Sequence, residues 1–365
     1  MLHLKELLKD INRLEASDLY LSLDAPPSFR VHGKVQTVGD TKVTSAILES
    51  IAKEILEPEA YKVFLSTNEY NTALHYEEIG RFRTNLYRQK GNISIVIREI
   101  RTHIQSIDNL ELPNIIKEIS MMKRGLVLVV GATGSGKSTT IAAMIDHRNT
   151  NESGHIITIE DPIEFIHQHK QSIISQREIG IDTESYHVAL KNALRQAPDV
   201  VLIGEIRDQE TMEAAVTFAE TGHLCLATLH SNNANQTLER ILSFYPPEKH
   251  RQIYHLLSLN LKGIISQRLV SAIDNKRRVA SMEILLDSPR VKDLISKGET
   301  AELKHAMEQG TVIGMRTFDD HLFELYKGNK ITLEEALRNA DSVNNLRLKI
   351  KLTQDEIVEP NKCFK

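Results

Sequence analysis

The sequence predicts an α/β protein, with a small α+β unit at its N-terminus and a parallel sheet wrapped by helices after it. Three observations predict this class. The chain has 365 residues, which is enough for two domains of ordinary size. Four short apolar runs, LVLVV, IITI, VVLI and LCLATL, alternate with helical segments between residues 125 and 229. After about residue 250 the pattern becomes mainly helical, which predicts a helical C-terminal part.

Residues 1–100 carry the pattern of the α+β unit. A helical stripe of leucine and isoleucine runs from Leu2 to Leu14, and a second helical period follows at 44–56. The remaining predicted elements of this unit are strands at 19–23 and 28–38 and a hairpin of 81–89 with 92–100. The polar stretch 101–113 is interpreted as a linker.

The second domain is expected at 114–345. The four apolar runs are typical of parallel strands that are buried on both faces. The predicted helices of the C-terminal part are 254–269, 288–298, 318–328 and 332–340. Residues 346–365 lose periodicity and are interpreted as a tail.

The composition excludes several classes of protein. The 45 basic and 49 acidic residues give a net charge of −4, so no broad nucleic-acid surface is expected. The two cysteines, Cys225 and Cys363, form neither a disulfide framework nor a zinc site, which favours a reducing cytoplasm. The longest apolar stretch, Gly125–Ala132, is far shorter than the ~20 residues that span a bilayer.

The stretch GATGSGKST, Gly131–Thr139, fits the phosphate-binding pattern G-x-x-x-x-G-K-[ST]. A predicted strand precedes it and a predicted helix follows, and this context disfavours a chance glycine-rich loop. The glycines let successive N–H groups point at phosphate oxygens, and the helix adds its positive end. Lys137 is expected to reach the phosphates and Ser138 to ligate Mg²⁺. The expected ATP-binding residues are Gly131, Thr133, Gly134, Ser135, Gly136, Lys137, Ser138 and Thr139.

Two groups of carboxylates follow predicted strands. The first is Glu160, Asp161 and Glu164, around a proline that ends its strand; a solvated acidic turn is the alternative. The second is Glu205, which follows VVLI and a glycine where many phosphate-loop enzymes carry Asp. Glu205 is expected on the metal side through Mg²⁺-bound water, with Glu160 as a further metal-ligand candidate. Glu164 is expected to be the base for the attacking water.

Two histidines, His223 and His230, flank the run LCLATL. Zinc needs three or four ligands at short spacing, and no such set surrounds them. In a strand they fall on opposite faces, so chelation of one ion by both is disfavoured. Two interpretations remain for each histidine: packing in the core, or a position beside the γ-phosphate.

The segments GATGSGKST, IEDPIEF, VVLIGEIRD and TGHLCLATLH, in this order, resemble the Walker A motif, Asp box, Walker B motif and His box of the type II/IV secretion and pilus ATPases. Within that family the chain is most similar to the PilU-type members of the PilT/PilU branch of pilus retraction ATPases. The resemblance implies a PAS-like N-terminal domain and a RecA-like phosphate-loop ATPase domain. It also implies a homohexameric motor that uses ATP and Mg²⁺.

The same resemblance implies location, partners and roles for single residues. The motor would lie in the cytoplasm, peripheral to the inner membrane at the pilus base, and would work with a PilT-like ATPase and the inner-membrane platform protein. Glu164 would be the catalytic glutamate and Glu205 the Walker B glutamate. His223 and His230 would sense the nucleotide state. Arg81, Arg83 and Arg98 occupy the places of arginines that reach the phosphates from the N-terminal domain, and ordinary exposed arginines are the alternative.

One departure from the family pattern bears on function. The retraction branch carries AIRNLI, whereas this chain has RVKDLI at 290–295, with Lys292 and Asp293 for Arg and Asn. This departure favours an accessory motor over independent retraction. Two other classes stay open: a hexameric nucleic-acid translocase, which the Asp box, the His box and the net charge disfavour, and a nucleotide-binding structural partner of another ATPase, which the intact catalytic residues disfavour.

Overall fold

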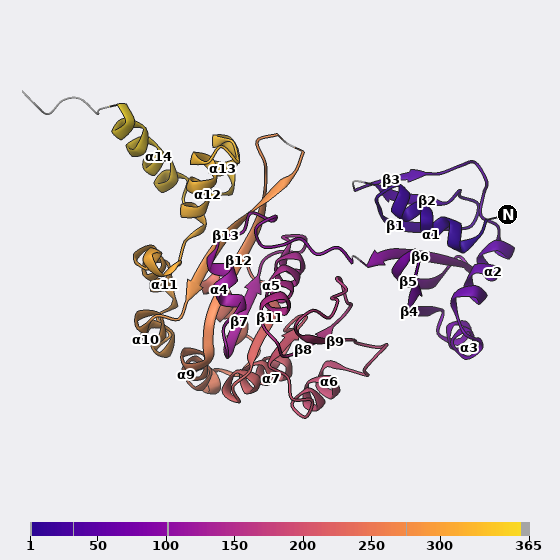
Figure 1. The fold of residues 1–365 in the computed structure, drawn as a ribbon, viewed down its shortest axis with the longest axis horizontal. Helices are drawn as coiled ribbons and strands as arrows, with labels where there is room; N and C mark the ends of the chain where they lie inside the picture. The colour runs from indigo at the N-terminus through magenta and orange to yellow at the C-terminus, as the bar shows by residue number, and fades with distance from the viewer. Residues whose placement is uncertain (1, 32, 101, 275, 359–365) are drawn as a thin grey trace, which may run out of the picture. The chain divides into compact units, whose positions relative to one another are not determined.

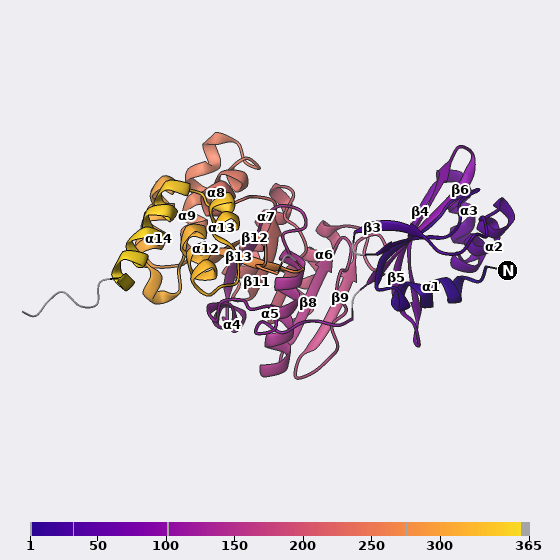
Figure 2. The same ribbon diagram turned by 90° about the horizontal axis from the view of Figure 1, so that it is seen from above.

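The computed structural model describes residues 2–358 apart from 32, 101 and 275, and the side chains only as far as residue 353. The chain forms two compact units, each with its own sheet (Figures 1 and 2). The first unit holds the residues up to His103 together with Glu164–Ile166, and the second holds the rest. The predicted mixed α/β class is confirmed.

The first unit contains a six-stranded antiparallel sheet in the order β3-β2-β1-β6-β5-β4. Its elements are α1 (Leu4–Arg13), β1 (Ala16–Leu21), β2 (Ser28–Val31), β3 (Lys34–Thr37), α2 (Ser45–Ile55), α3 (Pro58–Thr67), β4 (Glu69–Tyr76), β5 (Gly80–Gln89) and β6 (Asn92–Ile100). Buried leucines and isoleucines of α1 and α2 form one core with Phe82 and Leu86 of β5. The predicted hairpin and both predicted helices are confirmed. β4 and α3 were not predicted. β4 is a half-exposed edge strand and α3 buries only Phe64, so neither has a clear apolar pattern in the sequence.

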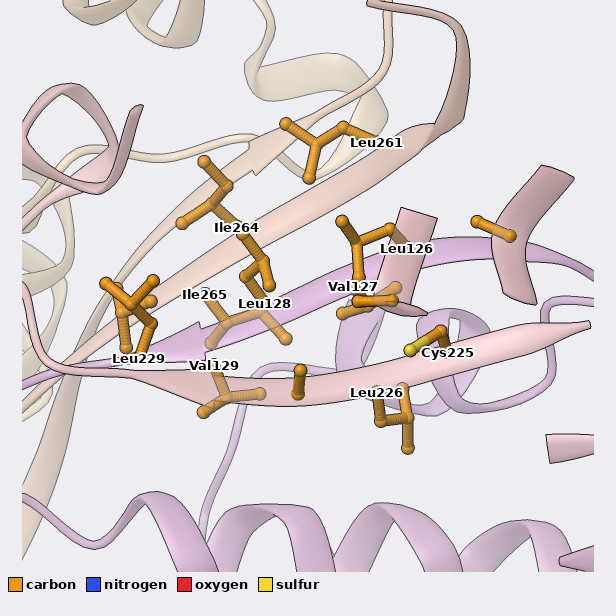
Figure 3. Packing of buried hydrophobic residues seen from close by; sticks show 14 of the residues in the cluster. Leu126, Val127, Leu128, Val129, Cys225, Leu226, Leu229, Leu261, Ile264 and Ile265 are labelled. Atoms are coloured by element: carbon orange, nitrogen blue, oxygen red, sulfur yellow. The ribbon is translucent and has the colours of Figure 1, made fainter. Parts of the chain in front are cut away.

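The second unit contains a seven-stranded sheet in the order β13-β12-β7-β11-β10-β8-β9. Its strands are β7 (Gly125–Val130), β8 (His155–Glu160), β9 (Ile173–Glu178), β10 (Val200–Ile203), β11 (Leu224–Leu229), β12 (Leu261–Ser271) and β13 (Arg278–Leu286). All neighbours are parallel except β12 and β13. The four predicted parallel strands are therefore confirmed, as β7, β8, β10 and β11. Every residue of β7 and β11 is buried, and Figure 3 shows their side chains packed with those of β12.

The helices of the second unit lie on both faces of this sheet. Figure 2 shows α4 and α5 on one face and α7 and α8 on the other. The helices are α4 (Ile115–Ser120), α5 (Lys137–Asn151), α6 (Tyr186–Ala193), α7 (Gln209–Glu220), α8 (Ala234–Leu242), α9 (His250–Asn260), α10 (Pro289–Lys297), α11 (Leu303–Gln309), α12 (Phe318–Lys327), α13 (Leu333–Asn339) and α14 (Val343–Val358). Among the described residues, no helix is both long and apolar enough to cross a membrane.

Two segments of the second unit differ from what the sequence pattern indicates. Residues 254–269 are not one helix, because α9 ends at Asn260 and the chain continues as β12, which pairs with β7 and β13. Residues 346–358 of the expected tail belong to α14, and Leu346 and Ile350 in this helix are buried in a hydrophobic cluster. Residues 359–365 of the expected tail lie outside the described residues.

Candidate functional site

The phosphate loop connects β7 to α5 through residues 131–136. Gly131, Gly134 and Gly136 have φ angles of 154°, 78° and 89°, which L side chains rarely adopt. A Cβ on Gly131 would lie 2.5 Å from the carbonyl oxygen of Gln267, and one on Gly136 would lie 2.8 Å from the Nε2 of the same residue. Both the backbone twist and the close approach of β12 therefore require glycine in this loop.

Polar groups in this loop are arranged to receive an anion. Lys137 Nζ donates to the carbonyl oxygens of Gly131 and Ala132, at 2.8 and 3.0 Å. The hydroxyl of Ser135 is buried and has no hydrogen-bond partner among the described residues. A pocket of about 300 Å³ lies over the loop, and Asn232 and Gln267 also line it. An orphaned hydroxyl, a lysine and a glycine-lined cradle fit a phosphate group.

A second pocket, of about 260 Å³, lies against Gly136 and Thr139. Its apolar wall includes Leu110, Leu112 and Leu269. Leu110 and Leu112 come from the stretch interpreted as a linker, where Leu112 is buried in the core of the second unit. The phosphate loop therefore has two pockets beside it, and the second is walled in part by leucines.

Charged side chains gather where β8, β10 and β11 end. Glu205 Oε2 accepts a hydrogen bond from Arg207 Nε at 2.5 Å, and Glu205 Oε1 lies 3.0 Å from His230 Nε2. Arg207 Nη1 also donates to Asp161 Oδ2 at 3.1 Å. The hydrogen bond to Glu205 raises the pKa of Arg207 despite the opposing desolvation. Arg207 thus joins Asp161, from the first carboxylate group, to Glu205, and Glu205 in turn contacts His230.

Arg207 was not predicted as a site residue, although the segment GEIRD places it two residues after Glu205. Residues two apart in an extended segment share a side, so the arginine is placed to meet the carboxylate of Glu205.

The tight packing around Gly204 accounts for glycine at the position where many phosphate-loop enzymes carry Asp. A Cβ at this position would lie 3.1 Å from Glu160 Cα, 3.1 Å from the carbonyl oxygen of Ile159 and 3.0 Å from the Tyr186 hydroxyl. Thr228 on β11 also donates a hydrogen bond to the Gly204 carbonyl oxygen. A side chain at position 204 would press on the end of β8, so glycine suits this position and Glu205 is the carboxylate that follows β10.

Glu160 is engaged within the sheet. Its Oε1 accepts from the hydroxyl of Thr158 at 2.6 Å and from Gln176 Nε2 at 3.4 Å. No cluster of three or more His, Cys, Asp or Glu in the described part of the chain is suited to hold a metal ion alone. A Mg²⁺ ion needs only one or two protein ligands when phosphates and water supply the others, and the half-buried Ser138 directly after Lys137 fits as one of them. The metal roles of Ser138, Glu205 and Glu160 stay predictions.

The structure does not bring His223 to this site. His223 precedes β11 and His230 follows it, so the strand separates them by roughly 20 Å. The His223 ring packs edge-on against Phe218, and its Nδ1 lies 3.0 Å from the Thr221 hydroxyl. His223 therefore lies at the opposite edge of the sheet from the phosphate loop of the same chain. Its role as a sensor of the nucleotide state stays a prediction.

The three predicted arginines lie on one sheet of the first unit. Arg81 and Arg83 alternate with buried Phe82, and Arg83 is the cross-strand partner of Arg98. Arg98 Nε pairs with the buried Asp18 at 2.7 Å, so Arg98 has a structural partner within its own unit. Arg81 Nε is buried without a hydrogen-bond partner in the described structure.

Glu164 is exposed and groups with the first unit. Its catalytic role and those of the arginines stay predictions.

The sequence and the fold are similar to those of known proteins. A model of the family described as type II/IV secretion system protein matches residues 107–356. The type IV pilus ATPase PilU of Pseudomonas aeruginosa is 50% identical over 348 residues, which cover 95% of this chain and 91% of that protein. The type IV pilus retractation ATPase PilT of the same organism is 37% identical over 340 residues, covering 93% of this chain and 98% of that protein.

A solved structure shares the fold of most of the chain. The crystal structure of the pilus retraction motor PilT with bound ADP matches with a TM-score of 0.88 at 37% identity, covering 95% of this chain and 100% of that one. The ATPase DotB of Legionella pneumophila matches with a TM-score of 0.74 at 26% identity, covering 91% of this chain and 93% of that one.

Proposed function

The chain belongs to the type II/IV secretion system protein family, and on that premise we propose that it is an ATP-hydrolysing motor of the type IV pilus machinery. Its work is pilus retraction and twitching motility beside a PilT-like ATPase, at the cytoplasmic base of the pilus. The second unit is the RecA-like ATPase domain of this motor and the first unit its PAS-like domain. The similarity to PilU and PilT over more than nine-tenths of the chain supports this proposal.

One observation of the structure carries the chemistry: the phosphate loop and the Asp161–Arg207–Glu205–His230 cluster are built on neighbouring strands of one sheet. β7, which leads into the loop, pairs with β11, which leads to His230, and β11 pairs with β10, which leads to Glu205. Ligands of open parallel sheets bind at this carboxyl edge. A nucleotide whose phosphates lie in the loop would present its γ-phosphate to these side chains.

The residues of the chain then have separate tasks. The loop N–H groups and Lys137 bind the phosphates, and Lys137 exchanges its two carbonyl partners for phosphate oxygens. Ser138 and Glu205, the latter through water, would hold Mg²⁺, which when bound neutralises charge between the β- and γ-phosphates. His230 and Arg207 keep the Glu205 carboxylate in place. Glu164 acts as the base that orients and activates the attacking water.

In this proposal, the pocket at Leu110, Leu112 and Leu269 holds the base of the nucleotide. Its apolar wall and its position against Thr139 suit the nucleobase, because flat aromatic rings are held mainly by apolar contact.

A homohexamer completes the proposed motor. Arg81 and Arg83 share one face of β5, and in a ring they would reach the phosphates of a neighbouring subunit. An arginine supplied in this way is worth roughly 10³–10⁵ in rate. The platform protein of the inner membrane is the proposed partner that receives the force.

The segment RVKDLI, which departs from the AIRNLI of the retraction branch, is the basis for proposing an accessory role. Lys292 pairs with Asp287 at 3.1 Å and Asp293 with Lys297 at 2.8 Å, so both departing residues are engaged in local ion pairs on or beside α10. The ion pairs on this surface of α10 therefore differ from those that Arg and Asn at positions 292 and 293 would form. We propose that the chain needs a PilT-like ATPase for retraction.

The test is Mg²⁺-dependent ATP hydrolysis by the purified full chain, with light scattering in the same buffer. Hydrolysis by a hexamer is expected, with Glu164→Gln still binding ATP but turning it over far more slowly. Loss of ATP binding in Glu164→Gln, to the same extent as in Lys137→Ala, would contradict the role given to Glu164. Stimulation by DNA would favour a nucleic-acid translocase. Tight ATP binding without turnover, with or without an added PilT-like ATPase, would favour a structural nucleotide-binding partner.

A further inference from the structure

A buried carboxylate on β13, Glu283, has no part in the proposed chemistry. Its side chain is only 3% exposed, and it lines neither of the two pockets beside the phosphate loop. Glu283 Oε1 accepts the backbone N–H of Ala234 at 2.8 Å and the hydroxyl of Ser266 at 3.1 Å. Burial raises the pKa of Glu283, and these two hydrogen bonds oppose that rise. A buried carboxylate is costly in a core, so its partners indicate what it does.

The first partner, Ala234, is the first residue of α8. The first N–H groups of a helix have no acceptor within the helix, and negative charge is favourable at that end. The Asn233 side chain accepts one of them, from Gln236 at 2.9 Å, and Glu283 accepts another, from Ala234. The start of α8 is therefore held from its own loop and from β13.

The segment before α8 reaches the catalytic cluster. Residues 230–233, here called the sensor loop, join β11 to α8. His230 of this loop contacts Glu205, and Asn232 lines the pocket over the phosphate loop. β11 fixes one end of the sensor loop and Glu283 fixes the other.

The second partner, Ser266, connects this anchor to the phosphate loop. Ser266 is the cross-strand partner of Glu283, and its neighbour Gln267 accepts a hydrogen bond from Thr140 Oγ1 at 2.7 Å. Thr140 lies in the first turn of α5, directly after the phosphate loop. Successive residues of a strand face opposite sides of the sheet. β12 therefore holds α8 on one face and α5 on the other, at adjacent residues.

We propose that Glu283 is a positioning residue that anchors the sensor loop to the β12–β13 hairpin and so aligns His230 and Glu205 with the phosphate loop. The inference rests on the proposed ATP hydrolysis. Without the anchor, Thr140, directly after the phosphate loop, keeps its hydrogen bond to Gln267. Nucleotide binding is therefore retained, whereas the alignment of His230 and Glu205 that turnover needs is lost.

Hydrogen exchange of the full chain, followed by mass spectrometry, tests the anchor without any need for turnover. In Glu283→Ala, amides of residues 230–238 should exchange roughly tenfold faster, since a bond to a charged group is lost. Amides of residues 131–140 should change less than about twofold. Glu283→Gln keeps an acceptor without the charge and should lie between Glu283→Ala and the unchanged chain.

Ser281→Ala is the matched control. Ser281 is buried on the same face of β13, two residues earlier, and its hydroxyl has no hydrogen-bond partner in the described structure. Its exchange at 230–238 should match that of the unchanged chain. Ser266→Ala removes one of the two partners of Glu283 and replaces Glu283→Ala in the test if that variant does not fold.

The second readout separates positioning from simple stability. Glu283→Gln should lower kcat about tenfold and leave the Kd for ADP within about twofold. Unchanged exchange at 230–238 would overturn the anchor, whatever the ATPase assay shows. Faster exchange with unchanged kcat would overturn the positioning role, as would an equal effect of Ser281→Ala. An unchanged chain without turnover would instead contradict the proposed function, while its exchange data still decide the anchor.

Discussion

The two histidines that flank β11 share a motif and a residue type, yet the two ends of the strand give them different surroundings. His230, at the carboxyl end, lies 3.0 Å from the Glu205 carboxylate in a cluster of charged side chains. His223, at the amino end, packs against Phe218 and contacts the Thr221 hydroxyl. In a parallel sheet, the edge at which a residue lies decides its chemistry more than the motif that contains it.

The backbone shows the same difference between the two edges. At the amino edge the groups join strand to strand: the His223 carbonyl oxygen accepts from Gly125 N–H, and the Asp199 carbonyl oxygen accepts from Leu224 N–H. At the carboxyl edge the chain leaves the sheet in the phosphate loop, where Ser135 lines a pocket and Lys137 donates to the loop carbonyl oxygens. The amino edge is closed by its own hydrogen bonds, and the carboxyl edge offers groups to a ligand.

The largest effect is expected for the residue at the centre of the carboxyl edge. Lys137→Ala removes the ammonium that bridges the Gly131 and Ala132 carbonyl oxygens and that would bind the phosphates. ATP turnover should fall roughly 10²–10³-fold, because a preorganised donor to developing charge is lost. Steady-state hydrolysis and ATP titration measure this loss. Full activity in Lys137→Ala would remove the phosphate loop from the catalytic site.

His230→Ala should have the next largest effect. The variant leaves Glu205 with Arg207 as its remaining partner in the cluster, and a hydrogen bond to a charged group is worth about 1.5–3 kcal/mol. This corresponds to a fall in kcat of roughly 10–150-fold, with ADP affinity unchanged. Single-turnover hydrolysis beside an ADP titration separates the two. A fall in ADP affinity that accounts for the whole loss would assign His230 to binding.

Much of this comparison could be predicted from the sequence. The strands β7, β8, β10 and β11 can be predicted from the sequence alone. Each is a short, continuous apolar run, and such a run is typical of a parallel strand that is buried on both faces. Strand, loop and helix then place the phosphate-binding residues at one edge.

The other features depend on contacts distant in sequence. β12 was interpreted as the end of a helix because its apolar residues gain their strand conformation by pairing with β7 and β13. The sequence shows that His223 and His230 differ in face, but the direction of β11 relative to β7 decides which one lies at the phosphate loop. The Arg207–Asp161 contact likewise joins β8 to β10, across 46 residues of sequence.

Gly204→Ala tests how tightly the carboxyl edge is packed. The added methyl group would lie 3.1 Å from the Glu160 Cα and 3.1 Å from the Ile159 carbonyl oxygen, both of them backbone atoms. Overpacking of this kind costs about 1–3 kcal/mol in the free energy of unfolding. Urea denaturation measures this cost, with Ser281→Ala as the control of nearly unchanged stability. A stability within about 0.5 kcal/mol of the unchanged chain would show that β8 and β10 can separate here, and the account of the missing Asp would fail.

His223→Ala should have the smallest effect, and a different kind of effect. The variant loses an edge-on ring contact with Phe218 whose centroids lie 5.8 Å apart, and such contacts contribute about 0.5–1.5 kcal/mol to stability. The midpoint of urea denaturation should fall accordingly, while kcat at a temperature well below the transition stays within about twofold. His230→Ala under the same conditions should show the reverse, with stability nearly unchanged and kcat lowered. If His223→Ala is as inactive as His230→Ala while remaining folded, the amino edge takes part in turnover. Because β11 separates this edge from the phosphate loop of the same chain, that result would place the action of His223 on a neighbouring subunit.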